Sequence, residues 1–175
     1  MKKGFTIIEL FVVISITFLL AAILFFGQAE HKQRVALNSA VFELIQNVRE
    51  VQEMAMVIKE TECNGTTTSR YGINFEKDNN SSYFLFADCG DREWEKDDND
   101  KLIREVELDR LVKIYHLSPP SDLNIVFRPP DPITYINGDS VDEEETIILS
   151  LRSDPGSADN QKSIKINSVG RIDIE

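Results

Sequence analysis

Residues 1–29 read MKKGFTIIELFVVISITFLLAAILFFGQA, and this stretch decides how the chain is organised. After Glu9 the segment carries no charge until Glu30. The uncharged run 10–29 has the length an α-helix needs to cross a bilayer, about 20 residues for a hydrocarbon core of roughly 30 Å. Lys2 and Lys3 precede it and favour a cytoplasmic N-terminus. We therefore expect one membrane-spanning helix, with the remainder of the chain outside.

Two features distinguish this segment from an ordinary secretory signal or anchor. A cleaved signal peptide has small residues after its apolar region, whereas Ala21-Ala22 is followed by Ile23-Leu24-Phe25-Phe26. Glu9 lies one helical turn inside the apolar segment, where an ionised carboxylate costs about 2.5–3.5 kcal/mol on insertion scales. Such a carboxylate needs a partner.

Lys2-Lys3-Gly4, then Phe5-Thr6-Ile7-Ile8-Glu9-Leu10 and the apolar helix, closely resemble the class III signal of type IV pilins and type II secretion pseudopilins. The resemblance implies that a prepilin peptidase of the cytoplasmic membrane cuts after Gly4 and methylates the new amine of Phe5. It also implies that the Glu9 carboxylate neutralises a Phe5 amine, typically that of a neighbouring subunit in a filament. A buried cation and a buried anion are tolerated only as a pair. The alternative is a plain anchor with an isolated glutamate.

Length and charge bound the rest of the chain. Its 175 residues, 42% of them hydrophobic, are enough for one domain of moderate size beyond the anchor. The formal net charge is −11, and cleavage after Gly4 would remove two lysines and make it more negative. This balance argues against nucleic acid as a partner, because binding phosphates needs a basic surface.

The segment 30–60 has the pattern of an amphipathic helix. Its apolar residues recur at steps of three and four, at Leu37, Val41, Leu44, Ile45, Val48, Val51, Ala55 and Ile58. No proline precedes Pro119, so the simplest expectation is one very long helix, with a kink near Gly27 as an option. We expect a leader at 1–4, a transmembrane or filament-core helix at 5–29, the amphipathic helix at 30–60 and a β-rich periplasmic or extracellular head at 61–175.

Beyond residue 60 the sequence indicates strands, which gives an α+β fold. Runs of β-branched and aromatic residues separated by polar loops predict strands at Tyr71–Phe75, Tyr83–Ala87, Val112–Leu117, Leu123–Phe127, Thr146–Leu151, Ser163–Asn167 and Arg171–Ile174. Hairpin-like turns at Asn137-Gly138-Asp139 and Asp154-Pro155-Gly156 favour antiparallel pairing.

Three head motifs resemble the GspH/FimT type of minor pseudopilin: Arg70–Phe75, Ile125–Pro130 and Ile164–Ile172. The resemblance implies a β-sandwich packed on the helix, and Gly170-Arg171 matches a glycine-arginine pair that recurs in the group. In FimT-like pilins of natural competence this region binds DNA, which makes Arg171 a candidate DNA contact. Here Asp173 and Glu175 follow it, so an arginine that braces the last strand against the sheet is favoured.

Few residues suggest chemistry. Cys63 and Cys89, on the outer side of a membrane, are candidates for a disulfide, with two separate thiols as the alternative. The acidic runs 88–100 and 139–145 lack the spacing of a calcium loop and are expected to be solvated. His31 and His116 are the only histidines, too few for a zinc site or a histidine-centred triad. We expect no enzyme, no cofactor or metal and no small-molecule substrate.

Taken together, the sequence predicts a minor pilin or pseudopilin that assembles with other such subunits through its N-terminal helix. Its partners would be those subunits, the prepilin peptidase and the cytoplasmic membrane. The chain would cross this membrane once, with its head outside, before it assembles into a pilus or pseudopilus. Two alternatives remain: a DNA-uptake minor pilin and a membrane-anchored binding domain that is never assembled.

Overall fold

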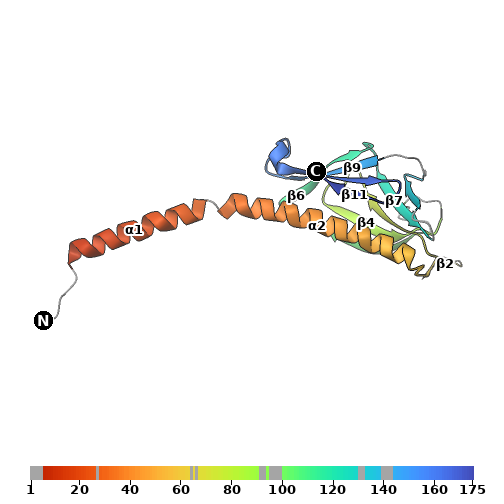
Figure 1. The fold of residues 1–175 in the computed structure, drawn as a ribbon, viewed down its shortest axis with the longest axis horizontal. Coiled ribbons are helices and arrows are strands. Elements are labelled where there is room, and N and C mark those ends of the chain that lie inside the picture. Colours follow the sequence, from red (N-terminus) through yellow and green to blue (C-terminus); the bar gives the residue numbers. More distant parts are fainter. Residues whose placement is uncertain are drawn as a thin grey trace. The chain divides into compact units, whose positions relative to one another are not determined.

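The computed structural model describes residues 6–26, 28–63, 65, 67–90, 94, 100–129, 133–138 and 144–175 (Figure 1). The chain consists of two compact units, Met1–Val35 and Ala36–Glu175. The fold is α+β, as the sequence predicts, with two helices and antiparallel sheets.

The first third of the chain forms two helices, where the expectation was one very long helix with a kink near Gly27 as an option. Helix α1 covers Ile7–Phe26 and helix α2 covers Gln28–Met56, with residue 27 outside the described part. The expected end at residue 60 is wrong, because α2 stops at Met56. Ile58 adopts a left-handed conformation with φ +53°, its N–H donates to Ala55 O at 3.0 Å, and Lys59 N–H donates to Met54 O at 3.2 Å. These are the hydrogen bonds of a Schellman cap, which close a helix end.

Eleven strands follow, counted over the described residues. They are β1 (Thr61–Glu62), β2 (Thr67–Thr68), β3 (Tyr71–Phe75), β4 (Ser82–Ala87), β5 (Lys101–Glu107), β6 (Val112–Ser118), β7 (Leu123–Arg128), β8 (Ile133–Ile136), β9 (Glu144–Leu151), β10 (Gln161–Asn167) and β11 (Ile172–Ile174). A short 3-10 helix, η1 (Ala158–Asn160), precedes β10.

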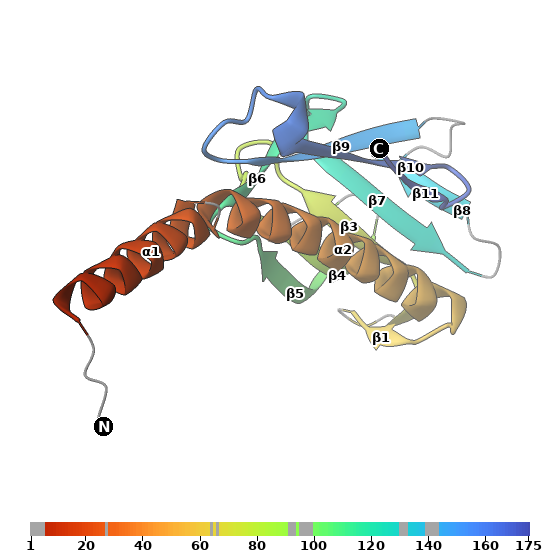
Figure 2. The same ribbon diagram turned by 60° about the vertical axis from the view of Figure 1, so that its left-hand side comes forward.

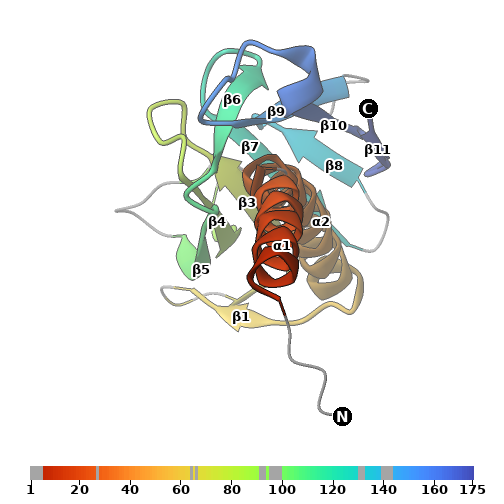
Figure 3. The same ribbon diagram turned by 90° about the vertical axis from the view of Figure 1, so that its left-hand side faces the viewer.

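The strands form two main sheets and a small β1–β2 pair. The five-stranded sheet has the order β5-β4-β3-β7-β8, and the four-stranded sheet has the order β11-β10-β9-β6. All pairings among the described strands are antiparallel. Residues 36–56 of α2 lie against the strands in Figure 2, and Figure 3 views the helix end-on with β6, β9 and β10 on one side and β4 and β5 on another.

One core unites α2 with both sheets. The apolar face of α2 supplies eight side chains, each at most 6% exposed: Leu37, Ala40, Val41, Leu44, Ile45, Val48, Val51 and Ala55. They share a single cluster with inward-facing residues of both sheets, among them Ile73 on β3 and Leu149 on β9. The periodicity therefore identified the buried face of α2 correctly, except at Ile58, which lies beyond the helix and is 53% exposed.

Sequence reasoning missed β1, β2, β5 and β8. Strand β5 contains Lys101, Arg104, Glu105 and Glu107 and lies at a sheet edge, where charged residues are common and the alternating pattern is weak. The expected hairpin at Asn137-Gly138 is also wrong: β8 and β9, which flank it, belong to different sheets. Asp154-Pro155-Gly156 does lie between the paired strands β9 and β10.

The face of the five-stranded sheet turned away from α2 carries a second apolar cluster. Phe86, Val126 and Tyr135 are buried there, and Trp94 packs on this cluster with its ring centroid 5.1 Å from that of Phe86. Gly72 lies beneath the Phe86 ring: a Cβ atom added to Gly72 would come within 2.6 Å of Phe86 and 2.9 Å of Val126. The glycine is required because the aromatic ring occupies the space of a side chain.

Gly72→Ala is expected to destabilise the head, since Phe86 must leave its position or the sheet must shift. Overpacking of this kind costs roughly 1–3 kcal/mol. Chemical denaturation with tryptophan fluorescence would measure it, because Trp94 reports on the same cluster. Gly90→Ala is the matched control, since a Cβ there meets nothing within 4 Å; equal stability of the two variants would contradict the packing argument.

Candidate functional site

Helix α1 exposes apolar side chains on all sides within its own unit. Ile8, Phe11, Val13, Phe18 and Ile23 are all at least half exposed. Its hydroxyl groups are already satisfied: Ser15 donates to Phe11 O at 2.8 Å and Thr17 donates to Val13 O at 2.9 Å. A helix that is apolar all round is stable only when something apolar covers it. Among the residues that the structure describes, no helix is both long and apolar enough to cross a membrane.

Glu9 lies in the first turn of α1. Thr6 caps this helix, with its Oγ1 accepting a hydrogen bond from Glu9 N–H at 3.3 Å. The pattern Thr6-x-x-Glu9 is that of a capping box, and an acidic residue in the first turn also favours the helix dipole. Sequence reasoning missed this local role. Gly4 and Phe5, the predicted processing residues, lie outside the described residues.

A hydrogen-bonded chain fastens α2 to strands β4 and β5. Asn47 of α2, 7% exposed, donates from Nδ2 to the Tyr83 hydroxyl at 2.6 Å, and its Oδ1 accepts from Arg104 Nη2 at 2.7 Å. The same Arg104 nitrogen lies 2.7 Å from Glu50 Oε2. Burial raises the pKa of the Tyr83 hydroxyl well above its usual value, the Asn47 hydrogen bond opposing part of that effect. In the sequence, the indication of these hydrogen bonds is Asn47, a polar residue on the apolar face of α2.

Cys63, directly after β1, is joined to Cys89, two residues after β4, in a disulfide with 5.8 Å between the Cα atoms. The bond ties the segment that leaves α2 to the end of a central strand. The two cysteines are 26 residues apart, and the loop-entropy model assigns such a crosslink roughly 3 kcal/mol.

Next to the disulfide, Arg70 and Asp88 form an ion pair with 3.2 Å between Nε and Oδ2. Asp88 is fully buried, and the Thr68 hydroxyl donates to its backbone oxygen at 2.7 Å. Arg70 Nη2 also donates to Gly90 O at 2.9 Å. The expectation that the run 88–100 is solvated is therefore wrong at Asp88, since its carboxylate is needed to neutralise a largely buried guanidinium.

The remaining acidic residues of the two runs are described only in part. Residues 91–93, 95–99 and 139–143 lie outside the described part of both acidic runs. Asp100 accepts a hydrogen bond from Cys89 N–H at 2.8 Å, Glu144 lies 3.7 Å from Lys165 Nζ, and Glu145 is only 7% exposed, so the second run is not wholly solvated either. Within the described residues, no group of three His, Cys, Asp or Glu side chains is placed to hold a metal ion.

The turn between β10 and β11 contains Gly170 and Arg171. Gly170 has φ +74°, and an added Cβ would come within 2.9 Å of Gln52 Nε2. Gln52 of α2 donates to Gly170 O at 2.7 Å, which anchors the turn. The Arg171 side chain is 70% exposed and bonds to Asp173 two residues on, with 2.9 Å between Nε and Oδ2. The expectation that the Arg171 side chain braces the last strand against the sheet is therefore wrong, because the guanidinium is in solvent and pairs within its own strand. The turn is held instead by the backbone N–H of Arg171, which donates to Asn167 Oδ1 at 2.8 Å.

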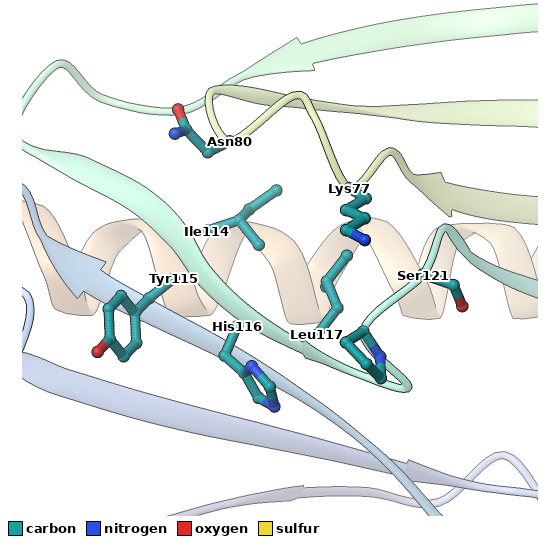
Figure 4. Close-up of a pocket in the computed structure, with 8 residues that line it drawn as sticks. Lys77, Asn80, Ile114, Tyr115, His116, Leu117 and Ser121 are labelled. Atoms are coloured by element: carbon teal, nitrogen blue, oxygen red, sulfur yellow. The ribbon is translucent and has the colours of Figure 1, made fainter.

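The two histidines are exposed and isolated from catalytic partners in the described residues. His31 lies on α2 and His116 on β6. His116 lines a hollow of about 190 Å³ with Lys77, Asn80, Tyr115 and others. Figure 4 shows that the His116 and Tyr115 side chains point away from the Asn80 side of this hollow. The geometry does not assemble an acid, a base and a nucleophile there.

Comparisons with protein-family models, with curated proteins and with solved structures found no match to this chain.

Tyr83→Phe is expected to reduce the loss of stability at alkaline pH. The folded-state pKa of Tyr83 lies above its unfolded value of about 10, so its contribution is complete below pH 10 and is lost as the pH rises beyond that. The native free energy of unfolding should fall by up to about 1.4 kcal/mol per pH unit from this residue. At pH 7 the variant should lose about 1–3 kcal/mol, because Asn47 Nδ2 stays buried without its acceptor.

Urea denaturation between pH 8 and pH 11 would measure both effects. Tyr115→Phe, at a 45% exposed tyrosine, is the matched control and should keep the native alkaline slope. An unchanged slope in Tyr83→Phe would contradict the assignment.

Proposed function

We propose that this protein is a non-enzymatic minor pilin or pseudopilin of the GspH/FimT type. The observation that carries the proposal is helix α1, whose apolar side chains are exposed on all sides and whose single charged residue is Glu9. Exposed apolar surface of this extent is stable only in a membrane or in a bundle of similar helices. The leader motif at 1–4 implies a cleavage after which α1 would move from the membrane into such a bundle.

The head supports the same reading. An amphipathic α2 buries its apolar face against antiparallel sheets, which is the arrangement that the pilin resemblance implies for the part outside the membrane. Gly72 and Gly170, both within the motifs that carry the GspH/FimT resemblance, are at positions where a side chain does not fit.

In the proposed mechanism, prepilin peptidase removes residues 1–4 and methylates the Phe5 amine while the apolar segment lies in the cytoplasmic membrane. The segment then moves into a bundle formed with the same segment of other subunits. Burial of apolar side chains holds such a bundle together but is non-directional. An ion pair between Glu9 and a Phe5 amine is directional, so it determines where each subunit stops along the bundle.

The alternatives have less support. DNA uptake through Arg171 is disfavoured because Asp173 holds that guanidinium, in a chain of net charge −11. An anchored domain that never assembles gives Glu9 no role beyond its helix cap. We therefore place the protein in a filament, as a secretion pseudopilus or pilus subunit.

Processing is tested by intact mass of the full chain made alongside a prepilin peptidase. The native protein should lose residues 1–4 and gain one methyl group, whereas Gly4→Ala should stay full length because the residue at the cleaved bond has changed. A control pilin must be cut in the same cells. A native chain that stays full length beside a processed control would exclude the filament reading.

Glu9→Gln should reduce incorporation into filaments by at least about tenfold without affecting the head, because removing one partner leaves a buried amine uncompensated, a loss of about 3–5 kcal/mol. Glu30→Gln is the matched control: Glu30 is an exposed acid on α2 that pairs with Arg34 at 3.1 Å, and exposed pairs contribute little. The measurement is the amount of each variant in sheared filaments relative to membranes. Normal incorporation of Glu9→Gln would favour the unassembled domain.

A further inference from the structure

Two hollows on the head lie on either side of Arg128, the last residue of β7. The first is apolar, has a volume of about 200 Å³ and is lined by Ala55, Met56, Phe127 and Val169 together with Gln52 and Gly170. The second is polar and is lined by residues 67–70, Cys89 and Pro129. Arg128 lines both.

The apolar hollow is held rigidly. Phe127, 2% exposed, forms part of the core, and Gln52 anchors the 167–171 turn through its 2.7 Å hydrogen bond to Gly170 O. Val169, at the tip of this turn, is 67% exposed. A cavity of about 150 Å³ with apolar walls is large enough to bind a benzene ring. The hollow therefore has room for one large apolar side chain and does not need to rearrange to admit it.

The end of α2 extends the apolar surface. Met56, Val57 and Ile58 follow one another and are all more than half exposed. Ile58 holds its left-handed backbone conformation at a helix-capping position that glycine normally occupies. This cap leaves the Ile58 side chain exposed beside those of Met56 and Val57.

The polar hollow offers hydroxyl groups and the guanidinium of Arg128, because the charge of Arg70 is neutralised by Asp88. Arg70 is fixed there by Asp88 and by Gly90 O, so its guanidinium cannot swing away. Arg128 contacts the Tyr135 hydroxyl at 3.4 Å, and no carboxylate among the described residues forms an ion pair with it. A guanidinium that pairs with no carboxylate of the described residues, beside the hydroxyls of 67–69, suits an oxyanion.

We propose that these two hollows form one binding groove for a polypeptide segment in which a carboxylate stands next to a large apolar side chain. The apolar side chain enters the hollow between Met56 and Val169, and the carboxylate binds Arg128. The ligand is expected to have both properties because Arg128 lines the apolar hollow and the polar hollow alike, so an apolar group and a carboxylate would bind side by side.

Other classes of ligand fit less well. Nucleic acid would use only the cationic side and would meet a strongly acidic chain. A free anion would leave Met56, Val57 and Val169 exposed. The proposal concerns the head alone and holds whether or not the protein enters a filament.

The test is selection from a displayed library of random heptapeptides on the biotinylated full chain, in a sterol-based detergent whose rigid tail is too bulky for the hollow. Enriched peptides should share an Asp or Glu beside an aliphatic or aromatic residue. Their affinity, measured by fluorescence anisotropy, should fall at least tenfold in Arg128→Gln and in Val169→Ser. Two exposed residues outside the lining provide matched controls, Arg110→Gln and Phe42→Ser, which should bind within twofold of the native chain.

Each other outcome overturns the proposal. Enriched peptides without a carboxylate that bind Arg128→Gln normally would indicate a purely apolar hollow. Acidic peptides that bind Val169→Ser normally would indicate a plain anion site. No enrichment over detergent-coated beads would exclude a peptide groove. Thermal melts of each variant verify that lost binding is not lost folding, which is expected because Arg128 and Val169 are both exposed.

Discussion

The head depends on burial of one face of α2 against two sheets at once. Neither sheet has a core of its own on that side: inward-facing residues of β3, β4, β7, β9 and β10 join the helix in one cluster. Removing the helix would expose both sheets, since apolar burial is the main favourable term in folding. The side-chain hydrogen bonds that join Asn47 to Tyr83 and Arg104 fix the position of α2 along the strands, because hydrogen bonds are directional and apolar contacts are not.

The second constraint is that the five-stranded sheet is covered on both faces. Its central strands β3 and β4 are buried throughout, which requires a cover opposite α2. Trp94 supplies part of it by stacking near Phe84 and Phe86, and Asn124 Oδ1 accepts its backbone N–H at 3.1 Å. The disulfide and the Arg70–Asp88 pair lie at the end of β4, where the chain leaves the sheet for this cover.

The two units present apolar surface of different kinds. On α1 it surrounds the helix and lacks unsatisfied polar side chains at Ser15 and Thr17, which suits a uniform apolar environment. On the head it is confined to a small hollow beside Arg128, where shape and charge can discriminate between partners. The proposed assembly through α1 and the proposed recognition through the head would be separate tasks, and they would place different demands on the sequence.

What the sequence determined by itself was local. The α+β class, the buried face of α2, seven of the strands near their observed bounds and the pairing candidates Cys63 and Cys89 all followed from periodicity, composition or spacing. Edge strand β5 did not, because its charged residues weaken the alternating pattern. The Arg70–Asp88 pair, the cover by Trp94 and the convergence of Arg128 with Met56 and Val169 did not, because each depends on how strands and loops pack in space. Only the packing of the two sheets on α2 brings such residues together, and a pattern of neighbours along the chain carries no signal of it.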